Sequence, residues 1–93
     1  MLLPLDGPAA YGALSVSTAT ELKVGGSALT ERKVVSFQPT NGNVYYGYDS
    51  SVSTNNGTKV LKNQLVIIEA GEQLPVYLIA ETGTVDVRIT EVA

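Results

Sequence analysis

Apolar and polar residues alternate over short stretches along most of this chain. Between residues 84 and 89, the branched apolar side chains of Val85, Val87 and Ile89 take every second position. A period of two residues is typical of a β-strand with one buried face. Similar short runs, separated by Gly, Asn, Pro and Ser, predict strands over residues 14–17, 21–24, 33–38, 44–48, 58–61, 65–69, 76–81 and 84–89.

Two of these runs, residues 65–69 and 76–81, are apolar at nearly every position. A strand of this kind needs cover on both faces, so we expect each to be buried by a partner sheet or by another subunit. Between residues 33–38 and 44–48, the Asn41-Gly42 pair predicts a hairpin, because both residue types tolerate positive φ.

Residues 1–13 differ from the rest of the chain. Pro4, Gly7, Pro8 and Gly12 disfavour a helix or a central strand, because Pro lacks an N–H and Gly gains backbone entropy when unfolded. Apolar side chains are nevertheless present at Leu2, Leu3, Leu5 and Tyr11. We expect an irregular N-terminal arm that packs on a surface, either of its own domain or of a partner.

Composition supports one strand-rich domain over residues 14–93. Val, Ile and Thr together supply 25 of the 93 residues, and no helical periodicity extends beyond two turns. Short strands at this spacing predict an all-β fold, a small antiparallel β-sandwich or jelly-roll-like domain. A domain of this length has a thin core, so self-association would help to stabilise it.

Charge and residue usage exclude several classes of function. The chain has no His, Cys or Trp, so it lacks most of the side chains that serve metal binding, redox chemistry and catalysis. Its six basic residues are scattered and the net charge is −3, which argues against a nucleic-acid partner. No apolar stretch is long enough to span a membrane, and no signal peptide is recognisable at the start. We expect neither an enzyme nor a cofactor-binding protein.

Three groups of residues could carry chemistry, and each also has a structural explanation. The loop over residues 49–57 is rich in side-chain oxygens but lacks the spaced acidic ligands of a calcium loop, so we expect no metal there. Glu69, Glu72, Glu81 and Glu91 could pair as in a glycosidase, although they equally suit solubilising charges beside turns.

The third group is a tyrosine cluster. Tyr46 and Tyr48 share a face with Val44 and are expected in or beside the core, which leaves Tyr45 as the exposed contact. Arg32 has two alternatives: a salt bridge to Glu31, Asp86 or Glu91 within the domain, or a contact to a neighbouring subunit.

Residues 21–92 resemble a small β module of tailed-bacteriophage virions. The segments that carry the resemblance are Ala28-Leu29-Thr30-Glu31-Arg32-Lys33, Val44-Tyr45-Tyr46-Gly47 and the stretch from Leu78 to Ile89. Proteins that look like this serve as capsid decoration, or cement, proteins and as modules of tails and fibres. The resemblance implies no catalytic residue.

The resemblance implies a structural protein of the outer capsid surface, made in the host cytoplasm. It would bind the major capsid protein and itself, as a trimer or dimer, and stabilise the shell by bridging subunits. The partner-binding residues expected are Leu2, Leu3, Leu5, Tyr11, Arg32 and Tyr45. The alternatives are a receptor- or glycan-binding module of a tail or fibre, which would use Tyr45, Tyr48 and residues 49–57, and a head–tail connector.

Overall fold

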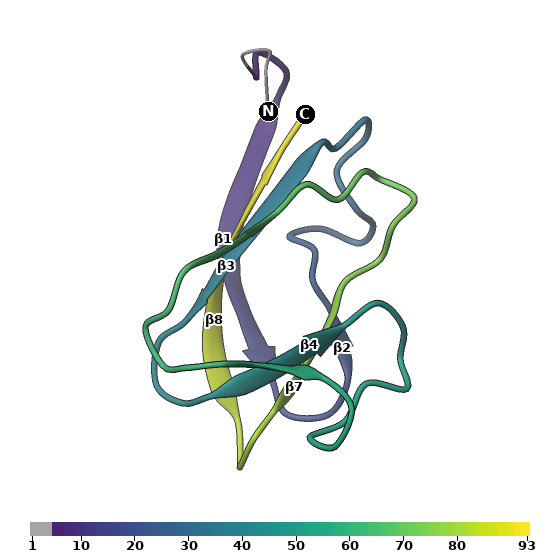
Figure 1. Ribbon diagram of the computed structural model, residues 1–93. Helices are drawn as coiled ribbons and strands as arrows, with labels where there is room; N and C mark the ends of the chain where they lie inside the picture. Colours follow the sequence, from purple (N-terminus) through teal and green to yellow (C-terminus); the bar gives the residue numbers. More distant parts are fainter. Residues whose placement is uncertain (1–4) are drawn as a thin grey trace.

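A computed structural model of the chain describes residues 5–93, which form an all-β structure without helices (Figure 1). Consequently, no helix in these residues could cross a membrane. The strands are β1 (Ala9–Val16), β2 (Thr20–Glu21), β3 (Val34–Pro39), β4 (Val44–Gly47), β5 (Thr58–Val60), β6 (Val66–Ile68), β7 (Tyr77–Ala80) and β8 (Val85–Val92).

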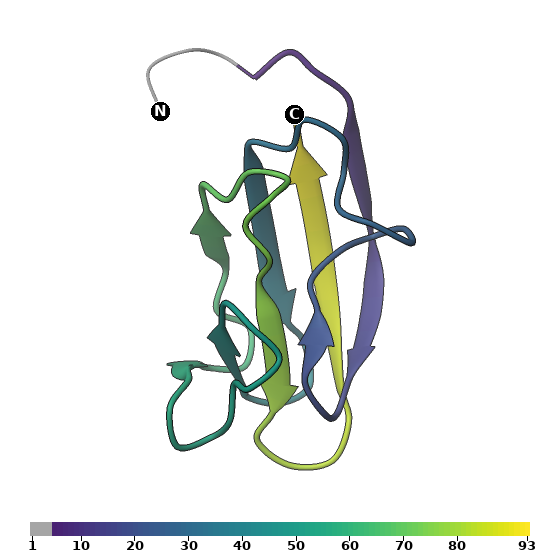
Figure 2. The ribbon, with the colours of Figure 1, turned by 90° about the vertical axis from the view of Figure 1, so that its right-hand side faces the viewer.

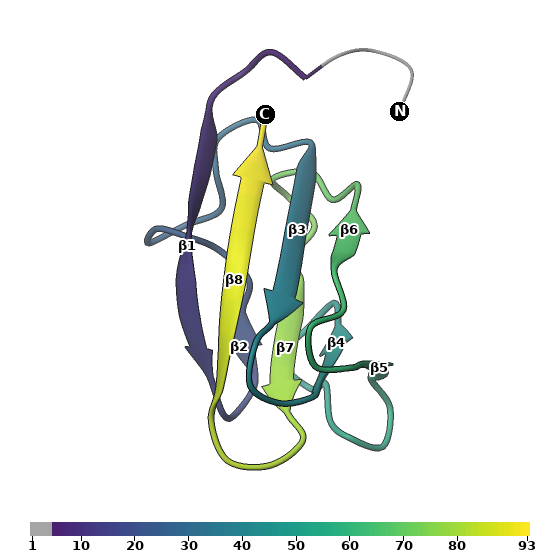
Figure 3. The same cartoon turned by 90° about the vertical axis from the view of Figure 1, so that its left-hand side faces the viewer.

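The strands form two four-stranded antiparallel sheets that pack face to face (Figures 2 and 3). Sheet A has the order β1-β8-β3-β6, and sheet B has the order β2-β7-β4-β5. Only β4 and β5 are paired neighbours in the chain; every other connection crosses from one sheet to the other. This interleaving of eight strands is that of a jelly roll, so the predicted fold class is confirmed.

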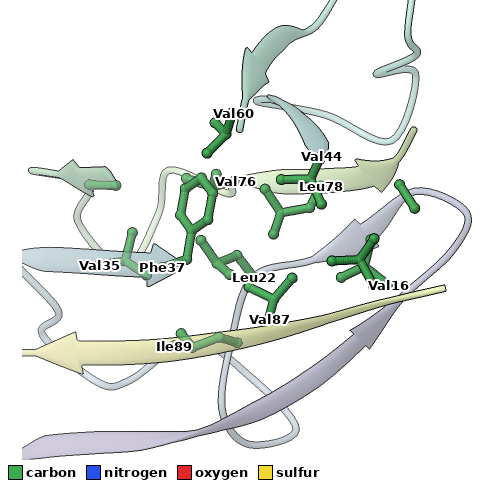
Figure 4. Close-up of a cluster of buried hydrophobic side chains, with 13 residues drawn as sticks. Val16, Leu22, Val35, Phe37, Val44, Val60, Val76, Leu78, Val87 and Ile89 are labelled. Atoms are coloured by element: carbon green, nitrogen blue, oxygen red, sulfur yellow. The ribbon is translucent and has the colours of Figure 1, made fainter. Parts of the chain in front are cut away.

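The core lies between the two sheets and consists of the inward-facing residues of both (Figure 4). Phe37 of β3 lies near its middle and meets the ring of Tyr46 of β4 edge to face, with centroids 6.0 Å apart. Fully burying one side chain of this kind contributes about 1.5–3 kcal/mol. Other buried members are Val16, Leu22, Val35, Val44, Val60, Val76, Leu78, Val85, Val87 and Ile89.

The N-terminal segment corrects one prediction. Residues 9–13, expected in an irregular arm, form the first part of β1, which pairs along its whole length with β8 from Ala9 opposite Val92 to Val16 opposite Val85. Pro8 lies just before the strand, and Gly12 is tolerated because β1 is an edge strand with one neighbour. Of the predicted arm, residues 5–8 are irregular within the part that the structure describes.

The Asn41-Gly42 turn also differs from the prediction, because it joins β3 of sheet A to β4 of sheet B and not two paired strands. Asn41 Oδ1 accepts a hydrogen bond from the Asp86 N–H at 2.8 Å, which ties the turn to the start of β8. A Cβ at Gly42 would lie 2.9 Å from Val85 Cγ2. A larger residue at position 42 would thus have to displace the Val85 side chain at the start of β8.

The two runs predicted to be apolar on both faces, residues 65–69 and 76–81, differ in how far they are buried. In β7, Leu78 is completely buried between the sheets, as predicted. Strand β6 instead forms the edge of sheet A, and only its inner face is covered: Val66 and Ile68 pack on the core, whereas Ile67 is 65% exposed. Of the two kinds of cover predicted for residues 65–69, the partner sheet thus covers only one face, and cover of the other face by another subunit stays a prediction.

Candidate interaction surfaces

The face of sheet A that points away from the core carries few charged side chains. Strand register places Tyr11, Thr90, Ser36 and Ile67 in one row across the four strands. The next row has Ala13, Arg88 and Gln38. We call these seven residues the outer face of sheet A. Few charged residues together with an exposed tyrosine are features of the centre of a protein interface.

Tyr11 is the most prominent side chain on this face, and it is 83% exposed. It borders a shallow depression of about 360 Å³ whose other lining residues are Gly12, Ala13, Arg88, Ile89 and Thr90. Across the depression, Arg88 forms a salt bridge at 3.0 Å to Asp86, its neighbour but one, which lowers the pKa of the Asp86 carboxyl. The depression is thus bordered by an aromatic ring and a neutralised ion pair.

Arg32 lies inside the domain, in the first of the two roles expected for it. Its side chain is 3% exposed and forms a salt bridge to Glu91, with Nη1 2.9 Å from Oε2. The remaining guanidinium N–H groups donate to backbone carbonyls of two loops, those of Leu22, Ala70, Gly71 and Leu74. With all its donors used internally, Arg32 offers no group to a partner surface in this conformation.

Glu91 completes this buried network from β8. Besides the salt bridge, its carboxylate accepts hydrogen bonds from the backbone N–H groups of Val24 at 2.9 Å and Leu29 at 3.1 Å. The predicted strand over residues 21–24 ends at Glu21 because the chain beyond Leu22 turns toward this carboxylate. Alternation along β8 could have revealed the site, because Glu91 continues the inward series of Val87 and Ile89.

Tyr45 lies on the outer face of sheet B in a polar network. Its hydroxyl donates to Glu81 Oε2 at 3.3 Å, and the same oxygen lies 2.9 Å from Lys59 Nζ. Asn43 donates to the other carboxylate oxygen. The hydrogen bond from Lys59, followed by that from Asn43, lowers the pKa of Glu81, while Glu81 raises the pKa of Lys59. Neither group is poised as an acid or base near neutral pH.

Of the other two tyrosines of the cluster, Tyr46 lies in the core region as predicted, whereas Tyr48 follows the end of β4 and is more exposed than predicted. Tyr46 packs against the core, and Tyr48 is 49% exposed with its ring 6.2 Å from that of Tyr46, edge to face. Tyr48 directly precedes the loop over residues 49–57, and hydrogen bonds made by the loop's own side chains hold that loop in place. Asp49, for example, accepts from both the backbone and the hydroxyl of Ser51, and these bonds lower its pKa.

Acidic residues do not gather into a reactive group. Glu91 is buried against Arg32, Glu81 bonds Lys59, and Glu72 accepts from the backbone N–H of Glu31 at 2.9 Å. Over residues 5–93, no three acidic side chains lie close enough together to hold a metal ion.

Of the predicted arm residues, Leu5 is 38% exposed, and two residues later the Gly7 N–H donates to the Ala93 carbonyl at 3.0 Å. Leu2 and Leu3 lie outside the described residues. The predictions did not include the exposed apolar side chains around β6, namely Leu61, Leu65 and Ile67.

Comparison with known proteins finds no family model, no curated protein and no solved structure that matches this chain. The resemblance to phage virion modules therefore stays a prediction from the sequence.

Proposed function

We propose that this chain is a structural protein of a virus particle that decorates the outer capsid surface through the outer face of sheet A. The observation that carries the proposal is the combination on this face of a tyrosine that is 83% exposed with surroundings in which the one charged side chain, Arg88, is paired with Asp86. Interface centres are depleted of charge and enriched in tyrosine, and a few such anchors supply most of the binding energy.

Two further observations support the same proposal. The jelly roll recurs in viral capsid domains, although this support is an analogy of fold and not of site. The polar networks of the described residues are internally satisfied, as the pairing of Arg32 with Glu91 and of Lys59 with Glu81 illustrates. In this proposal the chain binds the major capsid protein and itself, and it stabilises the shell because it binds only the assembled state.

A second candidate, a glycan- or receptor-binding module of a tail or fibre, is favoured by one observation. Tyr48 is 49% exposed and directly precedes the polar loop of residues 49–57, and an exposed aromatic side chain next to hydroxyl and amide groups suits a sugar ring. The two candidates use opposite sheets of the sandwich, so variants on each sheet distinguish them.

The test adds purified protein to shells assembled without it and measures the bound copies per shell. We expect Tyr11→Ala to weaken binding at least about tenfold, and Tyr48→Ala, a matched change on sheet B, to leave it unchanged. Hundreds of copies per natural particle would accompany this result. A few copies per particle, with binding to host glycans lost in Tyr48→Ala, would overturn the proposal in favour of the tail module.

A further inference from the structure

The free edge of β6 is an open, apolar strand edge. Ile67 is 65% exposed, and Leu65, which precedes the strand, is 59% exposed. Both follow the alternation that turns Val66 and Ile68 toward the core. In Figure 3, β6 forms the margin of sheet A, and no described segment lies beyond it at the level of the strand. Exposed apolar edges template the addition of another strand unless they are covered.

The pairing of β3 with β8 and with β6 determines which backbone N–H and C=O groups of β6 point to its free edge. Thr40 N–H donates to the Asp86 carbonyl, so even-numbered residues of β3 face β8 and odd-numbered ones face β6. Their partners in β6 are Val66, opposite Phe37, and Ile68, opposite Val35. The N–H and C=O of Ile67 therefore point to the free edge.

By contrast, the opposite edge of sheet A is partly screened. The loop that follows β2 projects past β1 on the side of sheet B (Figures 2 and 3). Its Val24 side chain packs over Gly12 of β1, where an added Cβ would lie 3.4 Å from Val24 Cγ1. A strand added to β1 would meet this loop, whereas one added to β6 would not.

We propose that β6 pairs with β6 of a second copy of this chain, antiparallel about a two-fold axis at Val66. In this register Leu65 lies opposite Ile67 of the partner, so the two most exposed apolar side chains of the edge cover each other. The two sheets A become one sheet of eight strands with a continuous outer face. The inference does not depend on the particle in which the chain works.

Charge at the two ends of β6 favours a second copy over an unrelated partner. Exposed Lys62 lies at the entry to the strand, whereas exposed Glu69 and Glu72 lie just after it. Antiparallel pairing about a two-fold axis brings the basic end of each copy to the acidic end of the other. The edge is thus complementary to itself in hydrogen bonds, apolar contact and charge.

The test is the oligomeric state of the full chain, measured by sedimentation over a broad concentration range. A strand edge gives a small interface, so we expect a concentration-dependent monomer–dimer equilibrium. Ile67→Lys should raise the dissociation constant at least about tenfold, because it places a charge in the apolar contact. Its side chain is exposed in the monomer, so folding should be retained, as checked by circular dichroism.

A matched pair of proline variants tests the edge itself. Ile67→Pro removes an N–H that points to the free edge and leaves the β3–β6 ladder intact, so it should also prevent dimers. Ala13→Pro makes the same change at the free edge of β1. The Ala93 N–H donates to the Pro8 carbonyl, so the even-numbered residues of β1 bond β8 and the backbone groups of the odd-numbered ones, Ala13 included, point to the free edge. This control should dimerise normally.

Hydrogen exchange provides a readout that a purely structural role would not change. The Ile67 amide should exchange quickly in the monomer and more slowly as concentration rises. A chain that stays monomeric throughout, a trimer or larger assembly, or a dimer lost in Ala13→Pro and kept in Ile67→Lys would each overturn the proposal.

Discussion

At the scale of single residues, the buried Arg32–Glu91 pair is the polar centre of the fold. Replacing a buried ion pair with apolar side chains is often neutral, because the desolvation cost disappears together with the attraction. Here the pair also satisfies four backbone carbonyls and two backbone N–H groups from loops that cross the end of the sandwich. Removing it leaves those groups without partners.

We therefore expect Arg32→Met and Glu91→Leu each to lower the free energy of unfolding by about 3–5 kcal/mol. The double variant should remain about as unstable as either single one, because the backbone groups are still unsatisfied. Urea unfolding of the three variants checks this. Recovery of the double variant to near the original stability would show that the ion pair, and not its backbone contacts, matters.

The exposed Glu81–Lys59 pair predicts a pH dependence of stability. The folded-state pKa of Glu81 lies below its ordinary value of 4.5, so its contribution is present above pH 4.5 and is lost as pH falls through the folded pKa. The pKa of Lys59 is raised above 10.5, so that contribution is present below pH 10.5 and lost above the folded value. Thermal melting of Glu81→Gln should fall less steeply with acid than that of the original chain. An equal fall of the melting temperature with decreasing pH in both proteins would refute this.

At the scale of elements, β1 ties the N-terminal segment to the fold. A chain that begins at Ala9 keeps every β1–β8 pair, so its melting temperature should stay within a few degrees of the full chain. A chain that begins at Leu14 loses five of the eight paired residues, from Ala9 to Ala13, and exposes the edge of β8. We expect this second chain to unfold at a much lower temperature or to aggregate. Equal melting temperatures for the two truncations would mean that β1 adds little.

Strands β6 and β7 have similar compositions but should respond differently to substitution. Leu78→Ala creates a cavity between the sheets and should cost about 2–5 kcal/mol. Ile67→Ala changes an exposed side chain and should cost under about 1 kcal/mol in the monomer. Denaturant titration at low concentration, where dimers dissociate, gives both values. A large loss for Ile67→Ala under those conditions would place its side chain in the core.

At the scale of the whole molecule, the topology predicts slow folding. Strand β8 is central in sheet A and pairs with β1, so sheet A joins residues 9–16 to residues 85–92, which are far apart in sequence. Closing such long loops costs conformational entropy before the stabilising contacts form, which raises the folding barrier. Sandwiches of β-strands therefore fold in about milliseconds to seconds. Stopped-flow refolding should follow this range, and a microsecond phase that completes the fold would contradict it.

The sequence by itself determined the approximate positions of most strands and which side of most of them is buried. Alternation in residues 84–89 and the apolar positions Val35 and Phe37 are local properties, because successive side chains of a strand point to opposite faces. The all-β class followed from this pattern alone.

Only the tertiary structure decided to which sheet each strand belongs. Asn41-Gly42 has the residues of a hairpin, yet the chain crosses there to the other sheet, since the pairing of β3 with β8 involves residues far apart in sequence. For the same reason, nothing local distinguishes the edge strand β6 from the central strand β7. The partner of Arg32 likewise depended on which strand came to lie beneath the loop, and the exposure of Tyr11 and Ile67 depended on where the sheet ended.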